Sequence, residues 1–223
     1  MSTYTKIQSI NYTPYNPNDP IQKAIGDIYQ NQLNLLKKTN PNEKKVLDYA
    51  CGPGRYLDFF PRNLSVDFVD PSYYSIKILK DKIFSNKSEA FQKTICSKLD
   101  NIKTKYDMIF SFGLIGEHIP ISKSLLNLFI DRLNFDSKLI ISIDLLNPQS
   151  KFFLRSIRDI IDTNLRIYSI KIPYLSSKRT FAPEIIKYIN NKRILSYDIY
   201  PLISPYSNTQ KSIYRHCILE INV

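Results

Sequence analysis

VLDYACGPGR, residues 46–55, is the stretch that decides the fold of this 223-residue chain. Its pattern predicts a short buried strand that runs into a tight glycine turn and then opens a helix. Such a turn directs backbone N–H groups and a helix N-terminus at one small volume. A carboxylate or a phosphate is the natural occupant of that volume, so we expect an anionic group of a ligand to bind at this turn.

The size and composition of the chain fit one globular α/β domain. Hydrophobic residues make up 43% of it, which is typical of a folded protein. No apolar run approaches the length of a membrane span, and the polar residues 1–11 lack the apolar centre of a secretory signal. We therefore expect a soluble, cytoplasmic protein with no membrane partner.

The positive charge of the chain has two explanations. A net charge of +11 can indicate a nucleic acid or another anionic partner. However, the lysines are spread along the chain, and the abundance of Lys, Ile and Asn is what an AT-rich coding sequence gives. We favour this compositional explanation and keep nucleic acid as the alternative partner.

The cysteines and histidines give no metal-binding pattern. Cys51, Cys96 and Cys217 are far apart and form no CxxC pair, and only His118 and His216 accompany them. Zinc sites built from such residues need closely spaced ligands. We therefore expect reduced thiols and no metal.

Strand patterns alternate with helical patterns along most of the chain. The strand patterns cover residues 45–49, 65–70, 91–96, 108–111, 138–144, 193–200 and 214–222. The helical patterns cover residues 19–38, 55–60, 73–84, 124–133, 152–161 and 183–190. This alternation predicts an α/β fold, a single-domain Rossmann-like sandwich with helices on both faces of a mainly parallel seven-stranded sheet. The last two strands lack a long crossover, which predicts one antiparallel strand near the C-terminus.

The single domain divides into four parts. Residues 1–43 are expected to form an N-terminal arm and helix, and residues 44–145 the ligand-binding core. Residues 146–182 are longer than a simple helix crossover, so we expect a lid over the strand ends. Residues 183–223 are expected to supply a C-terminal helix and the last strands.

Ligands of open α/β sheets bind at the carboxyl ends of the strands. Asp48, Gly52 and Gly54 follow the first predicted strand, and glycine lets a backbone approach its ligand. Asp70 ends the second strand and is able to accept both hydrogen bonds from a ribose diol. A dinucleotide fingerprint would need glycine where this chain has Leu57, and no Gly-Lys-Ser/Thr follows for a P-loop.

Four stretches together resemble the class I S-adenosylmethionine-dependent methyltransferases of small-molecule type. Residues 46–55 resemble their motif I, residues 66–72 (VDFVDPS) motif II, and residues 106–111 (YDMIFS) the fourth-strand motif. Residues 116–119 (GEHI) are similar to a Glu-His segment that often follows in small-molecule members. The match covers residues 44–145 and implies a methyltransferase whose cofactor is S-adenosyl-L-methionine.

The resemblance implies a cofactor site at the strand ends. Motif I would line the methionine part of the cofactor, Asp70 would hold the ribose, and Pro71-Ser72 would flank the adenine. The implied cofactor-binding residues are Asp48, Ala50, Gly52, Gly54, Asp70, Pro71, Ser97 and Ser111. Taken singly, Asp48 or Asp70 is equally well explained as a capping residue, but their order and spacing favour the site.

The chain departs from the family pattern at two places. Ala50 stands where the family usually has glycine, which is a small change. Ser97 lies near the end of the third strand, where the family often has an acid that contacts the adenine amino group. A backbone group or the Ser97 hydroxyl would have to substitute for that acid.

The catalytic residues leave a weaker trace. Methyl transfer from a sulfonium is a direct displacement, so the protein mainly aligns the nucleophile and removes a proton from a hydroxyl acceptor. His118 is the candidate base because histidine titrates near neutrality, with Glu117 as its partner or as an anchor of the loop. Asp144 would bind a substrate hydroxyl. Structural roles remain open for His118 and Asp144, and His216 is interpreted as a structural strand residue.

The segment after the fifth strand suggests how a substrate is held. Arg155 and Arg158 lie three positions apart on a predicted helix and share a face. Arginine recognises phosphate and carboxylate, so we expect an anionic group on the substrate; a solvated basic face is the alternative. Tyr15, in the N-terminal arm, is expected to close the same pocket.

These features predict a methyltransferase that acts on a small metabolite, with oxygen as the expected acceptor atom. An RNA-modifying methyltransferase is the first alternative, and the positive charge alone favours it. A non-catalytic protein that binds S-adenosylmethionine, such as a scaffold, is the second. The sequence specifies neither the acceptor nor the oligomeric state.

Overall fold

The computed structural model describes residues 14–38, 43–85, 92–116, 118–145, 161, 182–202 and 216–223. Its strands are β1 (Lys45–Tyr49), β2 (Ser65–Asp70), β3 (Gln92–Cys96), β4 (Tyr106–Ile115), β5 (Leu133–Asp144), β6 (Ser196–Leu202) and β7 (His216–Asn222). Its α-helices are α2 (Pro20–Lys38), α3 (Tyr73–Ser85), α4 (Lys123–Ile130) and α6 (Ile185–Tyr188). Short 3₁₀ helices are η2 (Leu57–Phe59), η3 (Leu99–Asn101) and η4 (Ala182–Glu184).

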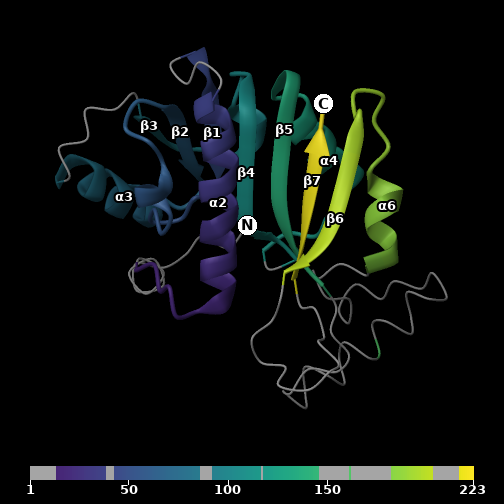
Figure 1. Cartoon of the computed structure of the whole chain (residues 1–223), viewed down its shortest axis with the longest axis horizontal. Helices are drawn as coiled ribbons and strands as arrows, with labels where there is room; N and C mark the ends of the chain where they lie inside the picture. Colours follow the sequence, from purple (N-terminus) through teal and green to yellow (C-terminus); the bar gives the residue numbers. More distant parts are fainter. Residues whose placement is uncertain are drawn as a thin grey trace.

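The strands form one mixed sheet in the order β3-β2-β1-β4-β5-β7-β6 (Figure 1). The first five strands of this order are parallel. β7 runs antiparallel to both β5 and β6, which confirms the predicted antiparallel strand near the C-terminus. The chain leaves β1 towards β2 on one side and returns to β4 on the other. The carboxyl ends of β1 and β4 therefore form a topological switch point, where open α/β sheets bind ligands.

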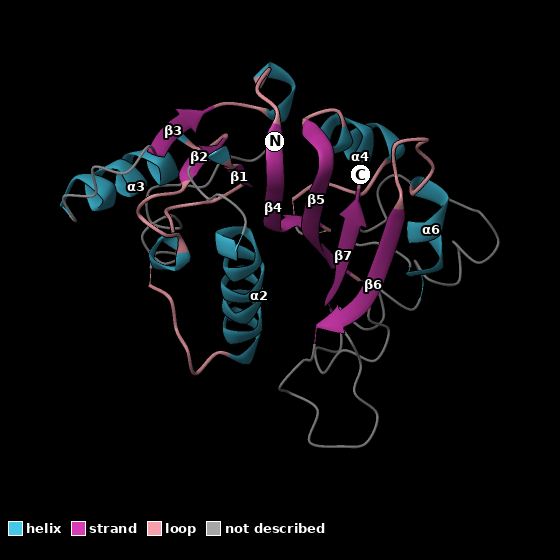
Figure 2. Ribbon diagram, turned by 45° about the horizontal axis from the view of Figure 1, so that its top comes forward, coloured by secondary structure: helices cyan, strands magenta, loops and turns pink. Residues whose placement is uncertain are grey.

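Helices cover both faces of the sheet, as the sequence predicts. Figures 1 and 2 show α2 in front of the sheet and α4 behind it. Residues of α2 and α3 pack into one hydrophobic cluster, and residues of α4 and α6 pack into another. The central strands supply both clusters alternately, because successive strand side chains point to opposite faces. Val46 packs with α2, for example, and Leu47 packs on the opposite face.

The helix α2 begins where the sequence predicts. Asp19 accepts hydrogen bonds at its Oδ1 from the backbone N–H groups of Ile21 (2.9 Å) and Gln22 (3.1 Å), so it caps the helix. Tyr29 and Leu33 are almost fully buried on the face that packs on the sheet. No helix in the described ranges is both long and apolar enough to cross a membrane.

The structure corrects the helix predicted over residues 55–60. Only the three-residue 3₁₀ helix η2 forms there, and the Phe60 backbone N–H closes it on the Leu57 carbonyl. Pro61 follows directly, and the residue before a proline is disfavoured in the helical region. The glycine turn therefore does not open an α-helix, so the predicted helix N-terminus is not available to a ligand there.

Other differences concern lengths and coverage. β4 and β5 extend beyond the predicted ranges 108–111 and 138–144, and the predicted helix 183–190 is divided between η4 and α6. The helix predicted over 152–161, apart from residue 161, lies outside the described residues, as does nearly all of the predicted lid.

Candidate functional site

The candidate site lies at the carboxyl ends of the parallel strands. β1 pairs with β2 and with β4 in parallel register, and β4 pairs likewise with β5. The residues that follow these strands therefore meet at one edge of the sheet. This edge brings together the glycine turn after β1, the carboxylate that ends β2, the loop after β4 and the carboxylate that ends β5.

The glycine turn is built from left-handed backbone. Ala50, Gly52 and Gly54 have φ angles of 59°, 57° and 74°. The backbone N–H groups of Ala50 and Cys51 both donate to the carbonyl of Val69 on β2, at 2.7 Å and 3.3 Å. These bonds extend the pairing of β1 with β2 past the strand end. The turn is consequently fastened to the sheet at the end of β1.

Gly52 presents open backbone at this edge. A Cβ atom built on Gly52 would meet no other atom within 4 Å, so a ligand has room to approach the main chain there. Gly54 differs, because a Cβ atom on it would lie 2.4 Å from the Leu79 side chain of α3. Gly54 is thus required for close packing of α3, and Gly52 keeps the ligand side of the turn empty.

Asp70 fastens the end of β2 to the glycine turn. Its Oδ2 accepts a hydrogen bond from the Gly52 backbone N–H (3.0 Å), and its Oδ1 accepts one from that of Ser72 (2.7 Å). Burial raises the pKa of Asp70, while the hydrogen bonds from Ser72 and Gly52 and the charge of His118 act in the lowering direction. Each carboxylate oxygen retains acceptor capacity beyond these bonds, as a ribose-binding carboxylate needs.

Asp48 is buried beneath the turn and hydrogen-bonded to α2. Its Oδ1 accepts a bond of 2.8 Å from the Tyr29 hydroxyl, and only 4% of Asp48 is exposed. Burial raises the pKa of Asp48 to about 7, the bond from Tyr29 lowers it, and the nearby charge of Asp70 raises it. Sequence reasoning missed Tyr29, because nothing in the local pattern links a helix residue to a strand 19 positions away.

An aromatic cluster surrounds this hydrogen bond. The Tyr29 ring centroid lies 4.5 Å from that of Phe110 and 5.1 Å from that of Tyr56. The predicted substrate residue Tyr15 joins the same cluster, with its ring centroid 5.2 Å from that of Phe59. The structure therefore places Tyr15 beside the segment that follows the glycine turn.

The remaining predicted cofactor residues lie at the same edge. Ser111 on β4 is fully buried, and its Oγ has no hydrogen-bond partner among the described residues. The backbone N–H of Ser97 donates to the Asp70 carbonyl (3.3 Å), and its hydroxyl donates to the Lys98 carbonyl (3.2 Å). Pro71 is half-buried beside them. A buried hydroxyl without a partner is costly, so Ser111 is a candidate ligand contact.

Asp144 and His216 meet across β5 and β7. The Asp144 Oδ1 and the His216 Nδ1 are 3.4 Å apart, and the two residues are register partners. Gly116, in the loop after β4, packs closely on Asp144, because a Cβ atom there would lie 2.5 Å from the Asp144 carbonyl oxygen. The loop that carries His118 thus lies against the end of β5.

His118 belongs to the same edge. Its backbone N–H donates to the Leu114 carbonyl (3.0 Å), the residue is half-buried, and its charge acts on Asp70. Glu117, Arg155 and Arg158 lie outside the described residues. The described part of the chain contains no group of three or more His, Cys, Asp or Glu side chains that could hold a metal ion.

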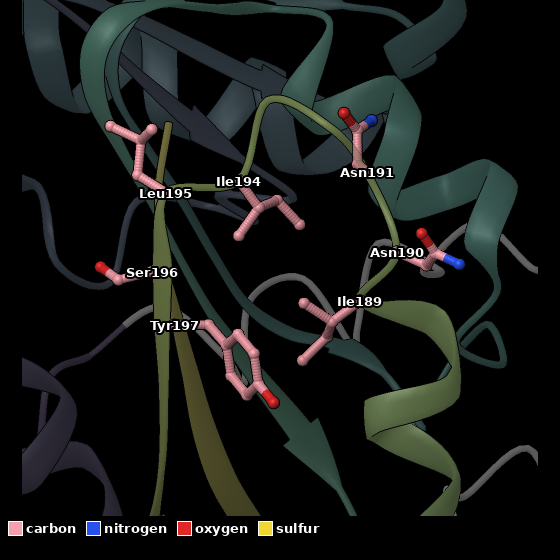
Figure 3. Close-up of a pocket in the computed structure, with 7 residues that line it drawn as sticks. All are labelled: Ile189, Asn190, Asn191, Ile194, Leu195, Ser196 and Tyr197. Carbon is pink, nitrogen blue, oxygen red and sulfur yellow. The ribbon is translucent and has the colours of Figure 1, made fainter.

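A separate pocket of about 430 Å³ lies between α6 and β6 (Figure 3). The residues that line it are Ile189, Asn190, Asn191, Ile194, Leu195, Ser196 and Tyr197. Ser196 begins β6 and pairs with Asn222, the last residue of β7, which in turn pairs with Lys138 in the amino half of β5. The pocket therefore lies at the amino edge of the sheet, away from the glycine turn, and contains none of the predicted site residues.

Comparison with known proteins identifies the family. Residues 22–179, more than half of the chain, match the methyltransferase domain family. Together with the sheet order and the glycine turn, this match defines the molecule as a class I methyltransferase that uses S-adenosylmethionine. The chain belongs to the methyltransferase domain family, as its motifs predict. No curated protein sequence matches it.

Several solved structures have the same fold. Magnesium protoporphyrin IX methyltransferase (ChlM) from Synechocystis PCC 6803 with bound SAH has 15% identity and a TM-score of 0.56, with 100% of this chain and 89% of that chain covered. The plantazolicin methyltransferase BpumL with a triazolic desmethylPZN analog and SAH has 17% identity and a TM-score of 0.59, with 96% of this chain and 89% of that chain covered. TehB from Haemophilus influenzae has 17% identity and a TM-score of 0.53, with 86% of this chain and 61% of that chain covered.

The left-handed conformation of Ala50 gives a first prediction. An L-residue in this region is strained by about 1–2 kcal/mol, which exceeds the entropy cost of a more flexible glycine. Ala50→Gly is therefore expected to raise the free energy of unfolding by about 0.5–1 kcal/mol, measured by urea denaturation. Ala24→Gly in α2 is the matched control and should lower it by a similar amount. A loss of stability in both variants would contradict the interpretation.

The buried Asp48 gives a second prediction. Its folded-state pKa of about 7 exceeds the ordinary value of 3.8, so the folded protein holds this proton more tightly than the unfolded chain. The resulting stabilisation is full below pH 4 and is lost as the pH rises towards 7. Between pH 5 and pH 7, the wild type should lose roughly 2 kcal/mol of unfolding free energy relative to Asp48→Asn. Urea denaturation across this range measures the difference, and parallel profiles would refute the prediction.

Proposed function

We propose that this methyltransferase transfers the methyl group of S-adenosylmethionine to an oxygen atom of a small molecule. One observation carries this proposal: an open glycine turn, the buried carboxylate of Asp70, and the two histidines His118 and His216 lie at the same edge of the sheet. The similar folds named above include enzymes whose names give protoporphyrin IX and plantazolicin as substrates, which supports a small-molecule acceptor.

The proposal treats the whole chain as one domain. Residues 44–145 form its cofactor-binding core, preceded by an arm and helix in residues 1–43. Residues 146–182, nearly all of them outside the described residues, are proposed to act as the lid over the substrate, and residues 183–223 as the part that completes the domain. The antiparallel β7 supports this division, because it joins the C-terminal part to the core through β5.

The residues at the strand ends fit the cofactor. Gly52 offers open backbone, Asp70 offers acceptor capacity for a ribose diol, and the buried Ser111 hydroxyl lacks a protein partner in the described ranges. Ala50 and the other residues of the turn line the same volume. The proposed cofactor residues are Asp48, Ala50, Gly52, Gly54, Asp70, Pro71, Ser97 and Ser111. When bound, the cofactor supplies a methyl group on a sulfonium, which is an excellent leaving group.

An oxygen acceptor needs a group that removes its proton. His118 is the proposed base, since histidine titrates near neutrality and the loop of this residue reaches the cofactor edge. The Oδ1 of Asp144 lies 3.4 Å from the Nδ1 of His216, and this contact is proposed to orient the His216 ring. The Asp144–His216 pair is proposed to bind the acceptor hydroxyl, and Glu117 to support His118. These roles are in line with an ether or ester product.

The substrate is proposed to carry an anionic group. Arg155 and Arg158, outside the described residues, would bind it, since arginine forms paired hydrogen bonds with carboxylate and phosphate. Tyr15 would close the pocket from the other side, where it packs on Phe59. The net charge of +11 favours RNA as the second candidate acceptor.

The cofactor assignment is tested with S-adenosylhomocysteine. The compound is expected to raise the melting temperature of the wild type. Asp70→Asn should weaken binding by about tenfold to a hundredfold, because it removes charge-assisted hydrogen bonds worth about 1.5–3 kcal/mol. The control Asp81→Asn removes an equal charge from the exposed side of α3 and should bind like the wild type. Equal binding by all three proteins would argue against Asp70 as the ribose ligand.

The acceptor assignment is tested with labelled S-adenosylmethionine and separate pools of metabolites and RNA. Label is expected in a small molecule, and NMR of the product should find the methyl group on oxygen. The unmethylated form of the labelled small molecule then serves as the substrate in kinetic assays. His118→Asn should lower kcat about a hundredfold or more, whereas His216→Asn should mainly raise KM. Label in RNA would favour the alternative, and a methyl group on nitrogen, carbon or sulfur would overturn the oxygen assignment.

A further inference from the structure

The hydrogen bond between Tyr29 and Asp48 links the N-terminal helix to the cofactor site. The Tyr29 hydroxyl donates to the Asp48 Oδ1 at 2.8 Å, and the exposed fractions of the two residues are 1% and 4%. Asp48 is in β1 immediately before the glycine turn, and Tyr29 is in the middle of α2. A buried bond between elements that far apart in the chain couples the position of α2 to the state of the carboxylate.

The surroundings of Asp48 in the described ranges are aromatic and anionic. From α2 it faces Tyr29, and from β2 the charge of Asp70 acts on it. On the turn side, the charge of Asp48 itself acts on the Cys51 thiol. Tyr56 faces Tyr29 from the segment after the turn. β4 contributes the rings of Phe110 and Phe112, with centroids 4.5 Å and 5.0 Å from that of Tyr29. Tyr29 thus donates a hydrogen bond to a carboxylate that has aromatic and anionic neighbours.

We propose that Tyr29 is a positioning residue that favours the ionised form of Asp48 beneath the glycine turn, and that cofactor affinity depends on pH near neutrality through this carboxyl group. The inference rests on the proposed cofactor site. S-adenosylmethionine carries an ammonium and a sulfonium, and both cations are attracted by a carboxylate at the turn. Binding therefore favours ionised Asp48 and releases its proton.

The direction of the pH effect follows from the state of Asp48 without cofactor. Its pKa is about 7, so the protein must lose this proton on binding when the pH is below 7. Affinity should rise with pH, by at most tenfold per pH unit for one proton, and level off above the midpoint. A hydrogen bond to the charged form favours that form. Removing the Tyr29 hydroxyl should therefore move the midpoint upward.

The test is calorimetric titration of the wild type, Tyr29→Phe, Asp48→Asn and Tyr56→Phe with S-adenosylmethionine from pH 5.5 to pH 8.5. Tyr29→Phe keeps the ring and loses only the hydroxyl. Its midpoint should rise by about one pH unit, so that binding at pH 7 is several-fold weaker and at pH 8.5 approaches that of the wild type. Asp48→Asn should show no such midpoint. Tyr56→Phe, which removes a hydroxyl from the same cluster, should follow the wild type.

A second measurement on the wild type does not depend on the Tyr29 variant being folded. Titration at pH 6 in two buffers of different ionisation enthalpy counts protons, and we expect close to one released per cofactor bound, with about half as many at pH 7, where half of Asp48 is already ionised. Equal midpoints in the wild type and Tyr29→Phe, a uniform loss of affinity at every pH, or no proton release would overturn the inference alone. Failure of the wild type to bind S-adenosylmethionine or S-adenosylhomocysteine at millimolar concentration would overturn the proposed function and the inference together.

Discussion

The carboxylate of Asp70 is the interaction on which the site depends, because it joins two strand ends that the sheet only places side by side. It accepts from the backbone N–H groups of Gly52 and Ser72. The glycine turn has left-handed backbone at Ala50, Gly52 and Gly54, so its conformation would be unfavourable without such support. The parallel pairing of β1 with β2 and β4 supplies further support, because it holds the ends of these strands at one edge of the sheet. The open backbone at Gly52 is a consequence of this arrangement.

Two buried carboxylates lie close together beneath this turn, which is an unfavourable arrangement for the fold. Burial raises the pKa of both Asp48 and Asp70, and each charge disfavours the other. Hydrogen bonds from Tyr29, Gly52 and Ser72 offset part of this cost. A cationic ligand would offset more, so residues that reduce stability in the protein alone become favourable for binding. Such a compromise between stability and binding is common at functional sites.

The sequence predicts the order of elements well and their lengths less well. The strand at 45–49 and the cap at Asp19 agree with the structure, because apolar alternation and capping are local. The helix over 55–60 was wrong, since apolar spacing in a six-residue stretch does not overcome the proline that ends it. The glycine turn and Asp70 were found because both lie beside predicted strands. The catalytic assignments at His118 and Glu117 and the substrate-binding assignments remain predictions. The substrate-binding residues are Tyr15, Asp144, Arg155 and Arg158.

By itself, the sequence determined the class of this protein, because a strand, a glycine turn and an acid at the next strand end form a local pattern that specifies a nucleoside-type ligand. Only the tertiary structure decided which residues support that pattern. Tyr29 reaches Asp48, and His216 reaches Asp144, across long separations that no local periodicity encodes. The packing of α2 on the sheet brings Tyr29 to Asp48. The antiparallel pairing of β7 with β5 brings His216 to Asp144. Their proximity arises from packing, which a single sequence does not display.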